Sequence, residues 1–377
     1  MIDSVRDKRV RRLRLAAPAL LAFVLGAVVG AQGDDAAPRQ AREPAPAQAE
    51  RTRDSVAKLP LEQQVGRLVI LRFAGTQAPG YVLRALREGR TAGAILFRDN
   101  IVSPAQLKAL TGALHDARDQ SLICVDQEGG EVRTLTWAGP QAAQSEQAAA
   151  GSERADARRA GRDLRAAGIT VTLAPVADVP SVSGAALAGR AFSSDPATAA
   201  RAVSEAIAGW HAAGIATTVK HFPGLGGATV NTDDGPATID RTPAELQADL
   251  EPFRSAIAAG TEFVMAGHAT YPALDGLHIA SQSPAIIDGV LRRDLGFDGV
   301  VMTDSLEAAA VRAVGDIEEA AIASVNAGVD VILTTGRGSY IHVYRALLAR
   351  AKADPEFRAR VRAAAARVAA AQSSLHG

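Results

Sequence analysis

The sequence has a single cysteine among its 377 residues, Cys124, which lies inside an apolar run. One cysteine excludes a disulfide framework within the chain and any zinc site built from several cysteines. The stability of the fold must therefore come from a packed core, which a chain of this length is able to build.

An excess of charge of either sign is also missing, because 41 Lys and Arg residues balance 41 Asp and Glu residues. Without a net charge, no overall field attracts nucleic acid or anionic lipid, so a nucleic-acid-binding function is disfavoured. The length fits either two ordinary domains or one large α/β barrel.

The N-terminal segment has little apolar sequence for a membrane span. A basic stretch, residues 1–14, precedes an apolar stretch from Leu15 to Val29, which is the order found in secretory signals. About 15 apolar residues are few for a helix that crosses ~30 Å of hydrocarbon. We expect residues 1–31 to be a signal peptide or, alternatively, an uncleaved membrane anchor with its basic end inside.

Large apolar residues are nearly absent from the next segment, residues 32–54, which is rich in Ala, Pro and charge. Such a segment buries too little surface to offset its ordering entropy, so we expect a disordered tether. Residues 55–377 then form a monomeric body outside the cytoplasm, either secreted or held at the membrane through the N-terminal segment alone.

A repeated helix-Gly-strand unit dominates the remaining sequence. Its clearest copies place a glycine between a helical stretch and an apolar run, at Gly168, Gly214, Gly260 and Gly328. Glycine supplies the left-handed residue that ends a helix, and a continuous apolar run suits a strand covered on both faces. Units of this kind in series predict a parallel sheet.

Helix starts support the same pattern, because Ser103, Asp195, Thr242 and Ser283 each precede a proline and are able to cap a helix. The predicted strands are 68–73, 92–97, 122–126, 169–175, 215–220, 263–267, 299–303 and 330–334. Eight such strands predict one (β/α)8 TIM barrel, with a two-domain α/β arrangement as the alternative.

Polar residues follow the ends of these strands, where barrel enzymes carry their chemistry. They are Asp126, Asp178, Lys220, His221, His268 and Asp304. Such a group suits a sugar, a phosphorylated metabolite or a metal ion. Structural interpretations compete with this one: Asp178 as a turn cap, His268 as a hydrogen-bonded core histidine, and Asp304 as a helix N-cap.

Four motifs together resemble one family. VDQEGG at 125–130, GRAFSSDP at 189–196, KHFPG at 220–224 and GFDGVVMTDSL at 296–306 are similar to the barrel of glycoside hydrolase family 3, in particular its single-domain bacterial β-N-acetylglucosaminidases (β-hexosaminidases). The similarity runs from about Leu59 to the C-terminus. Several ordered motifs in one chain are far more specific than any single one.

The resemblance implies a retaining hydrolase that removes terminal β-linked N-acetylglucosamine through a covalent glycosyl-enzyme. It assigns the nucleophile to Asp304 and sugar binding to Asp126, Arg190, Lys220 and His221. The implied substrate is a β-N-acetylglucosaminide, with peptidoglycan fragments (muropeptides) as the expected source, and no metal or cofactor is implied.

One loop departs from the family pattern. Relatives read KHFPGHGDTxxDSH, where the last Asp and His form the acid/base dyad, whereas this chain reads KHFPGLGGATVNTDDG. The dyad positions fall on Asn231 and Asp233. Either Asp233, or its neighbour Asp234, serves as the acid/base group, or the protein is a sugar-binding pseudoenzyme; a polar turn is the structural alternative. Thr134 also stands where relatives often have an arginine, beside Arg133.

Two other barrel chemistries compete with this assignment. A Schiff-base lyase would use Lys220 with a depressed pKa, and a metal-dependent hydrolase would use the His and Asp cluster.

Overall fold

The computed structural model describes residues 46–376, all of which belong to one compact unit. The predicted signal peptide or anchor lies outside them, as does the tether up to residue 45. Residues 46–54, predicted as tether, instead belong to helix α1 (Pro46–Ala57), which packs along α13 (Pro355–His376) and buries Val56. In the described part of the chain, no helix has the length and apolar character needed to cross a bilayer.

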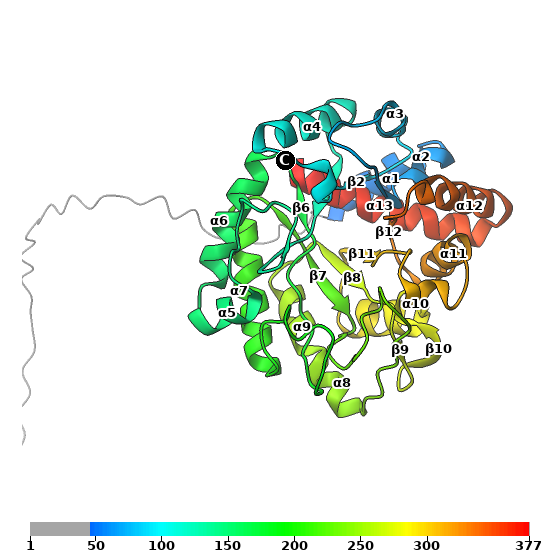
Figure 1. The fold of residues 1–377 in the computed structure, drawn as a ribbon. Helices are drawn as coiled ribbons and strands as arrows, with labels where there is room; N and C mark the ends of the chain where they lie inside the picture. The colour runs from blue at the N-terminus through cyan, green and yellow to red at the C-terminus, as the bar shows by residue number, and fades with distance from the viewer. Residues whose placement is uncertain (1–45, 377) are drawn as a thin grey trace, which may run out of the picture. The chain divides into compact units, whose positions relative to one another are not determined.

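The centre of the fold is an eight-stranded parallel sheet in the order β11-β8-β7-β6-β3-β2-β1-β12 (Figure 1). A parallel bridge between Met302 and Val331 joins the two outer strands, so the sheet closes into a barrel. The predicted TIM barrel is confirmed. Its strands are β1 (Val69–Arg72), β2 (Gly93–Ile95), β3 (Leu122–Val125), β6 (Val171–Thr172), β7 (Ala216–Phe222), β8 (Phe263–Ala266), β11 (Val300–Thr303) and β12 (Ile332–Leu333).

Seven of these strands lie inside their predicted ranges, and β7 continues two residues further, to Phe222. Two hairpins stand at the mouth of the barrel: β4 (Gln127–Gly129) with β5 (Val132–Arg133), and β9 (Thr270–Tyr271) with β10 (Asp275–Ile279). The first hairpin follows β3 and the second follows β8, so both belong to the loops that carry the candidate site.

Helices surround the barrel (Figure 1). They are α2 (Leu61–Gly66), α3 (Gly80–Arg87), α4 (Pro104–Ala117), α5 (Gln144–Ala150), α6 (Glu153–Ala166), α7 (Pro196–Ala212), α8 (Pro243–Asp249), α9 (Glu251–Ala258), α10 (Ala309–Arg312), α11 (Ile317–Ala327) and α12 (Ser339–Ala353), with short turns η1 (Arg98–Asn100) and η2 (Ala280–Gln282) and a π-helix, η3 (Ala285–Asp294). The predicted caps Ser103, Asp195 and Thr242 each accept a first-turn N–H. Ser283 likewise accepts from Ile286, although the helix it precedes is of the π type.

The interior of the barrel is packed with apolar side chains such as Ile70, Cys124, Met265 and Met302. Val368 of α13 joins this cluster from the N-terminal end of the strands. Nearby, Asp330 binds Arg292 and Arg367, and Gln372 of α13 donates to the carbonyls of Ala92 and Gln120, which precede β2 and β3. The last helix therefore closes this end of the barrel, and only the carboxyl ends of the strands are left for chemistry.

Candidate active site

A buried ion cluster lies where β3 and β7 end. The Nζ of Lys220 lies 2.7 Å from Asp126 Oδ1 and 2.7 Å from Glu128 Oε1. Arg190, in the loop before α7, donates from Nε and Nη2 to the two oxygens of Glu128 at 2.9 and 2.6 Å. Three of the predicted sugar-binding residues, Asp126, Arg190 and Lys220, thus share one network, and Glu128 is its centre.

Charges within this cluster determine the ionisation of Lys220. Burial disfavours its ammonium form, but the carboxylates of Asp126 and Glu128 outweigh burial and raise the pKa of Lys220. A Schiff-base nucleophile needs the opposite, a depressed pKa that leaves the amine neutral. The lyase alternative is therefore disfavoured, and Lys220 acts as a fixed positive charge.

His221 is held by Asp178 and faces Asp304. Its Nδ1 lies 2.7 Å from Asp178 Oδ2, and its Nε2 lies 3.8 Å from Asp304 Oδ2. Asp178 is fully buried and its other oxygen accepts the N–H groups of His221 and Leu225. Asp178 is thus more than a turn cap, because it orients the imidazole that contacts the predicted nucleophile.

Asp304 follows β11 and its Oδ1 accepts the N–H of Ser305 at 2.7 Å. Burial would raise its pKa, but His221 and His268 outweigh burial and hold the pKa of Asp304 below its usual value. The carboxylate is therefore ionised at neutral pH, as a nucleophile requires. The N-cap interpretation is not supported, since the next helix, α10, has Ala308 at its N-cap.

His268 lies behind Asp304 and is completely buried. Its Nε2 lies 3.0 Å from the carbonyl of Ser305, and its Nδ1 lies 2.8 Å from the hydroxyl of Ser281. A carbonyl only accepts, so Nε2 carries a proton and donates it to Ser305, while the Ser281 hydroxyl is the hydrogen-bond partner of Nδ1. Burial lowers the pKa of His268, and its two hydrogen bonds hold the ring against the backbone beside Asp304.

The loop that departs from the family pattern reaches the same centre. The carbonyls of Thr232 and Asp233 accept the N–H groups of Ala310 and Ala309, just beyond Asp304, each at 3.1 Å. Asn231 forms the turn, because its Oδ1 accepts the N–H of Asp233. The loop is therefore attached to the segment that follows the predicted nucleophile.

Asp233 and Asp234 both expose much of their surface to solvent, but their surroundings differ. The protein around the Asp233 carboxyl group removes part of its hydration, and this desolvation, followed by repulsion from the Asp304 carboxylate, raises the pKa of Asp233. Among the described residues, the side chain of Asp234 has no hydrogen bond or ion pair. Of the two acids, Asp233 is therefore the one that interacts with Asp304.

The two residues noted in the β4–β5 hairpin do not complete the ion cluster. Arg133 does not reach the cluster through hydrogen bonds, because it donates to the carbonyls of Gly130 and Thr136 in its own loop. Thr134 is buried beside Asp126, whose carbonyl accepts its N–H. Arg133 thus serves the hairpin and does not replace an arginine at position 134.

Comparisons with known proteins identify related sequences and structures. Residues 60–371 match the family model described as "Glycosyl hydrolase family 3 N terminal domain". The chain belongs to glycoside hydrolase family 3. It is 35% identical, over 278 residues, to a protein of Stenotrophomonas maltophilia named "Beta-hexosaminidase", covering 71% of this chain and 82% of that one.

Two solved structures are similar to this chain. A β-N-acetylhexosaminidase from Beutenbergia cavernae is 36% identical with a TM-score of 0.77, covering 84% of this chain and 99% of that one. A β-N-acetylglucosaminidase from Paenibacillus sp. is 33% identical with a TM-score of 0.80, and the match covers 84% of this chain and 63% of that one. The resemblance to β-hexosaminidases of family 3 that the sequence motifs indicated is confirmed.

Sequence reasoning missed two features of this family 3 site. Glu128 lies inside the VDQEGG motif, but its side chain was not predicted to contact Lys220 and Arg190, since it follows the strand end by three residues and stands in a hairpin. Asp178 was recognised at a strand end, and only its contact with His221 distinguishes it from a turn cap. The sequence did carry one signal for Glu128, which is an acidic residue between the predicted strand 122–126 and the glycine pair Gly129-Gly130.

Two cavities lie at the mouth of the family 3 barrel, and neither is lined by Asp304. One of about 530 Å³ contains Asp126, Arg133 and Thr134, so it adjoins the ion cluster. In the described part of the chain, no group of three or more His, Cys, Asp and Glu residues is positioned to hold a metal ion. The arrangement instead provides an ionised carboxylate, Asp304, and a second carboxyl group, Asp233, whose pKa is raised by desolvation and by repulsion from Asp304.

Replacing Glu128 with alanine is expected to destabilise the fold by about 3–5 kcal/mol at about pH 7, because Lys220 and Arg190 lose their shared buried partner. Lys220 and Arg190 outweigh burial and hold the pKa of Glu128 at about 2, below its ordinary 4.5. The contribution of Glu128 to the free energy of unfolding is therefore complete above pH 4.5, and it is lost as the pH falls toward 2. Urea unfolding of wild type and variant at several pH values measures this difference.

The exposed Glu131 of the same hairpin provides the control, because Glu131→Ala removes an equal charge from the surface. A Glu128→Ala variant as stable as the Glu131→Ala control at about pH 7 would contradict the central role of Glu128.

Proposed function

We propose that this family 3 protein is a retaining β-N-acetylglucosaminidase that removes terminal N-acetylglucosamine from a β-linked glycoside. The proposal rests on two interacting carboxyl groups whose pKa values are shifted in opposite directions. The pKa of Asp304 is lowered, and the pKa of Asp233 is raised. Two acids whose surroundings separate their pKa values in this way suit a nucleophile and a general acid. The names of the relatives support the sugar.

In the first step, an oxygen of Asp304 attacks the anomeric carbon while the proton of Asp233 passes to the leaving glycosidic oxygen. The C–O bond to the aglycone breaks, and the sugar is held as an ester of Asp304. In the second step, Asp233, now a carboxylate, removes a proton from water, which attacks the same carbon and releases Asp304. Two displacements return the sugar with its original β-configuration.

The ion cluster suits recognition of the sugar hydroxyl groups. Asp126 retains partial exposure, at 27% of its side chain, while the adjoining Lys220 and Glu128 are almost completely buried. Buried partners fix the positions of Asp126 and Lys220 before the sugar arrives, so little reorganisation is needed on binding. His221, fixed by Asp178, faces the nucleophile and stabilises its negative charge.

A pseudoenzyme is less consistent with these observations. A loop that had lost catalysis would not need to keep a carboxyl group within electrostatic reach of Asp304, yet the Asp304 carboxylate raises the pKa of Asp233. The backbone carbonyl of Asp233 also accepts the N–H of Ala309, in the segment that follows Asp304. Peptidoglycan fragments remain our proposed natural source of substrate. That proposal, and the location outside the cytoplasm, rest on the N-terminal sequence, residues 1–54.

The decisive assay compares p-nitrophenyl β-N-acetylglucosaminide with the corresponding β-glucoside, using the full-length chain. We expect nitrophenol release from the first and much slower release from the second, and NMR of the first-formed sugar should show the β-anomer. Absence of turnover between about pH 4 and about pH 8 would contradict the hydrolase proposal.

A further inference from the structure

The carboxylate of Glu307 joins two loops at the mouth of the barrel, and the mechanism above gives it no part. Its Oε2 accepts the Thr335 N–H at 2.8 Å and lies 3.0 Å from the Ser305 hydroxyl and 3.1 Å from the Thr335 hydroxyl. The two hydroxyl groups are 2.6 Å apart, so one of them donates to the other, which donates to Glu307. Because Ser305 stands just after β11 and Thr335 just after β12, one carboxylate oxygen connects the ends of two strands.

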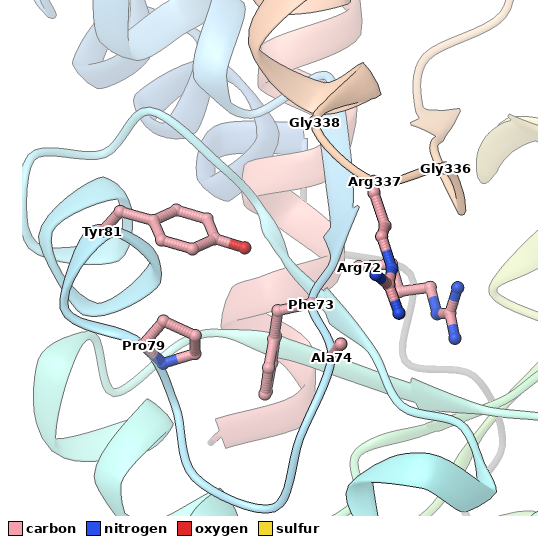
Figure 2. A pocket seen from close by; sticks show the side chains of 8 residues that line it. All are labelled: Arg72, Phe73, Ala74, Pro79, Tyr81, Gly336, Arg337 and Gly338. Atoms are coloured by element: carbon pink, nitrogen blue, oxygen red, sulfur yellow. The ribbon is translucent and has the colours of Figure 1, made fainter.

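Glu307 is ionised and closely fitted. Burial would raise its pKa, but the hydrogen-bond donors around the carboxylate outweigh burial and lower the pKa of Glu307. Gly336 leaves room for it, because a Cβ at that position would lie 2.8 Å from Glu307 Oε1. The loop from Gly336 to Gly338 lies beside Arg72 of β1 (Figure 2), and Arg72 donates to the Thr335 carbonyl at 3.2 Å. Thr335 is therefore held at its N–H by Glu307 and at its carbonyl by Arg72.

The sheet itself restrains this part of the barrel little. β11 pairs with β8 along its whole length, but it pairs with β12 through one isolated bridge, Met302–Val331. Beyond β11, a single backbone hydrogen bond of 3.2 Å, from Leu306 to Leu333, joins the two segments in the described part of the chain. A segment with few backbone hydrogen bonds opens easily. The contacts of Glu307 therefore supply much of the restraint on the segment that carries the proposed nucleophile.

Ser305 connects Glu307 to Asp304. The N–H of Ser305 donates to Asp304 Oδ1 at 2.7 Å, and the Ser305 carbonyl lies 3.0 Å from His268 Nε2. With Oδ1 bound in this way, Asp304 Oδ2 faces His221, 3.8 Å from its Nε2. A change in the backbone angles of Ser305 would move the N–H and release the orientation of the carboxylate, on which the rate of attack depends.

We propose that Glu307 is a positioning residue for the nucleophile. It anchors Ser305 to Thr335, and the anchored Ser305 N–H holds the Asp304 carboxylate with Oδ2 directed at the anomeric carbon. The contribution is geometric, since the negative charge of Glu307 disfavours a second carboxylate nearby. The inference rests on the proposed function, because it presupposes that Asp304 attacks a glycoside.

Kinetics of the full-length chain test this role. Glu307→Ala should lower kcat for the nitrophenyl N-acetylglucosaminide about 100-fold and change KM less than about threefold, because misdirection of the nucleophile affects the transition state and not substrate binding. Covalent labelling by a 2-fluoro glycoside should slow by a similar factor. Glu307→Gln keeps an oxygen acceptor and should stay within about fivefold of wild type. The control is Glu356→Ala, at an exposed acid of α13, which should behave like wild type.

The acidic limb of kcat/KM separates positioning from an effect of charge. Besides burial, the groups that act on the charge of Asp304 are His221 and Lys220 of β7, His268 after β8, the Ser305 N–H and Asp233 of the loop after β7. Misplacement of the Ser305 N–H removes a bond that lowers the pKa of Asp304, so the limb of Glu307→Ala should move to higher pH. Loss of a negative charge alone would move the limb of both Glu307 variants to lower pH, and that result would overturn the proposal.

A folded Glu307→Ala variant with wild-type kcat and labelling rate would also overturn it. If thermal unfolding shows that Glu307→Ala does not fold, Ser305→Ala takes its place, because this change removes the hydroxyl that Glu307 holds and keeps the N–H. Ser305→Ala should lower kcat about tenfold and raise the acidic limb in the same direction, and wild-type behaviour would again contradict the role of Glu307.

Failure of this inference differs from failure of the proposed function. A wild type without turnover contradicts the hydrolase itself, whereas an active wild type matched by Glu307→Ala contradicts the positioning role alone.

Discussion

Asp304→Ala is expected to lower kcat for the nitrophenyl N-acetylglucosaminide by about four orders of magnitude or more, since no other group takes the place of the attacking carboxylate. His221 and His268 lower the pKa of Asp304 below its usual value, so the wild-type group is ionised at neutral pH. Asp304→Asn keeps the size of the side chain but removes its negative charge, so it should lower kcat by a similar factor. Initial rates under saturating substrate measure the loss.

Asp298→Ala is the matched control, because this exposed acid precedes the same strand at its opposite end. It should retain nearly all activity, and thermal unfolding should show both variants folded. Mass spectrometry adds a second measurement: with a 2-fluoro glycoside, the wild type should carry a covalent adduct on Asp304. An Asp304→Ala variant with more than about a tenth of wild-type kcat would contradict the nucleophile assignment.

The second large effect is expected at Asp233. Asp233→Ala should lower kcat/KM by about 10²–10⁴-fold for a substrate whose aglycone is a sugar, because that leaving group needs a proton. The nitrophenyl substrate, which leaves without one, should be less affected in the first step. Its glycosyl-enzyme should then accumulate, giving a burst of nitrophenol, since water also loses its general base.

Azide distinguishes catalysis by Asp233 from a role in the turn. A small anion replaces the missing base by attacking the glycosyl-enzyme directly, so azide should accelerate the Asp233→Ala variant and yield the β-glycosyl azide. Asp234→Ala, at the adjacent exposed acid, should behave like wild type with or without azide. If azide leaves Asp233→Ala unchanged, Asp233 is structural and the acid/base group lies elsewhere.

The pH dependence of kcat/KM follows from the same pair of acids. Activity requires Asp304 ionised, so it falls as pH drops through the lowered pKa of Asp304. It also requires Asp233 protonated, so it falls as pH rises through the raised pKa of Asp233. The expected profile is a bell on the acidic side of neutrality, and Asp233→Asn should remove its alkaline limb.

Much of this fold followed from local signals. The glycines that end helices, such as Gly168 and Gly214, take positive φ angles of 77° and 75°, and the apolar runs after them form buried parallel strands. These signals act within a few residues, so they can be read from the sequence. Helix α1 was missed because its Ala-rich sequence carries little apolar surface, and packing against α13 decides its structure.

The candidate site was predictable where a motif coincides with a strand end, as for Asp126, Lys220, His221 and Asp304. It was not predictable where a contact joins distant segments. Glu128 and Arg190 are 62 residues apart, and no local pattern indicates their pairing. The same is true of Asp178 and His221, whose 43-residue separation is bridged by the parallel pairing of β6 with β7.

The sequence by itself determined the class of protein: a single barrel, its family, and a loop that lacks the family's usual proton donor. Only the tertiary structure decided which acid interacts with Asp304 and that Glu128 joins Lys220 to Arg190. The physical reason is that the sequence pattern specifies helices and strands over a few residues, whereas pKa values and ion pairs depend on the groups that distant loops bring together at the mouth of the barrel.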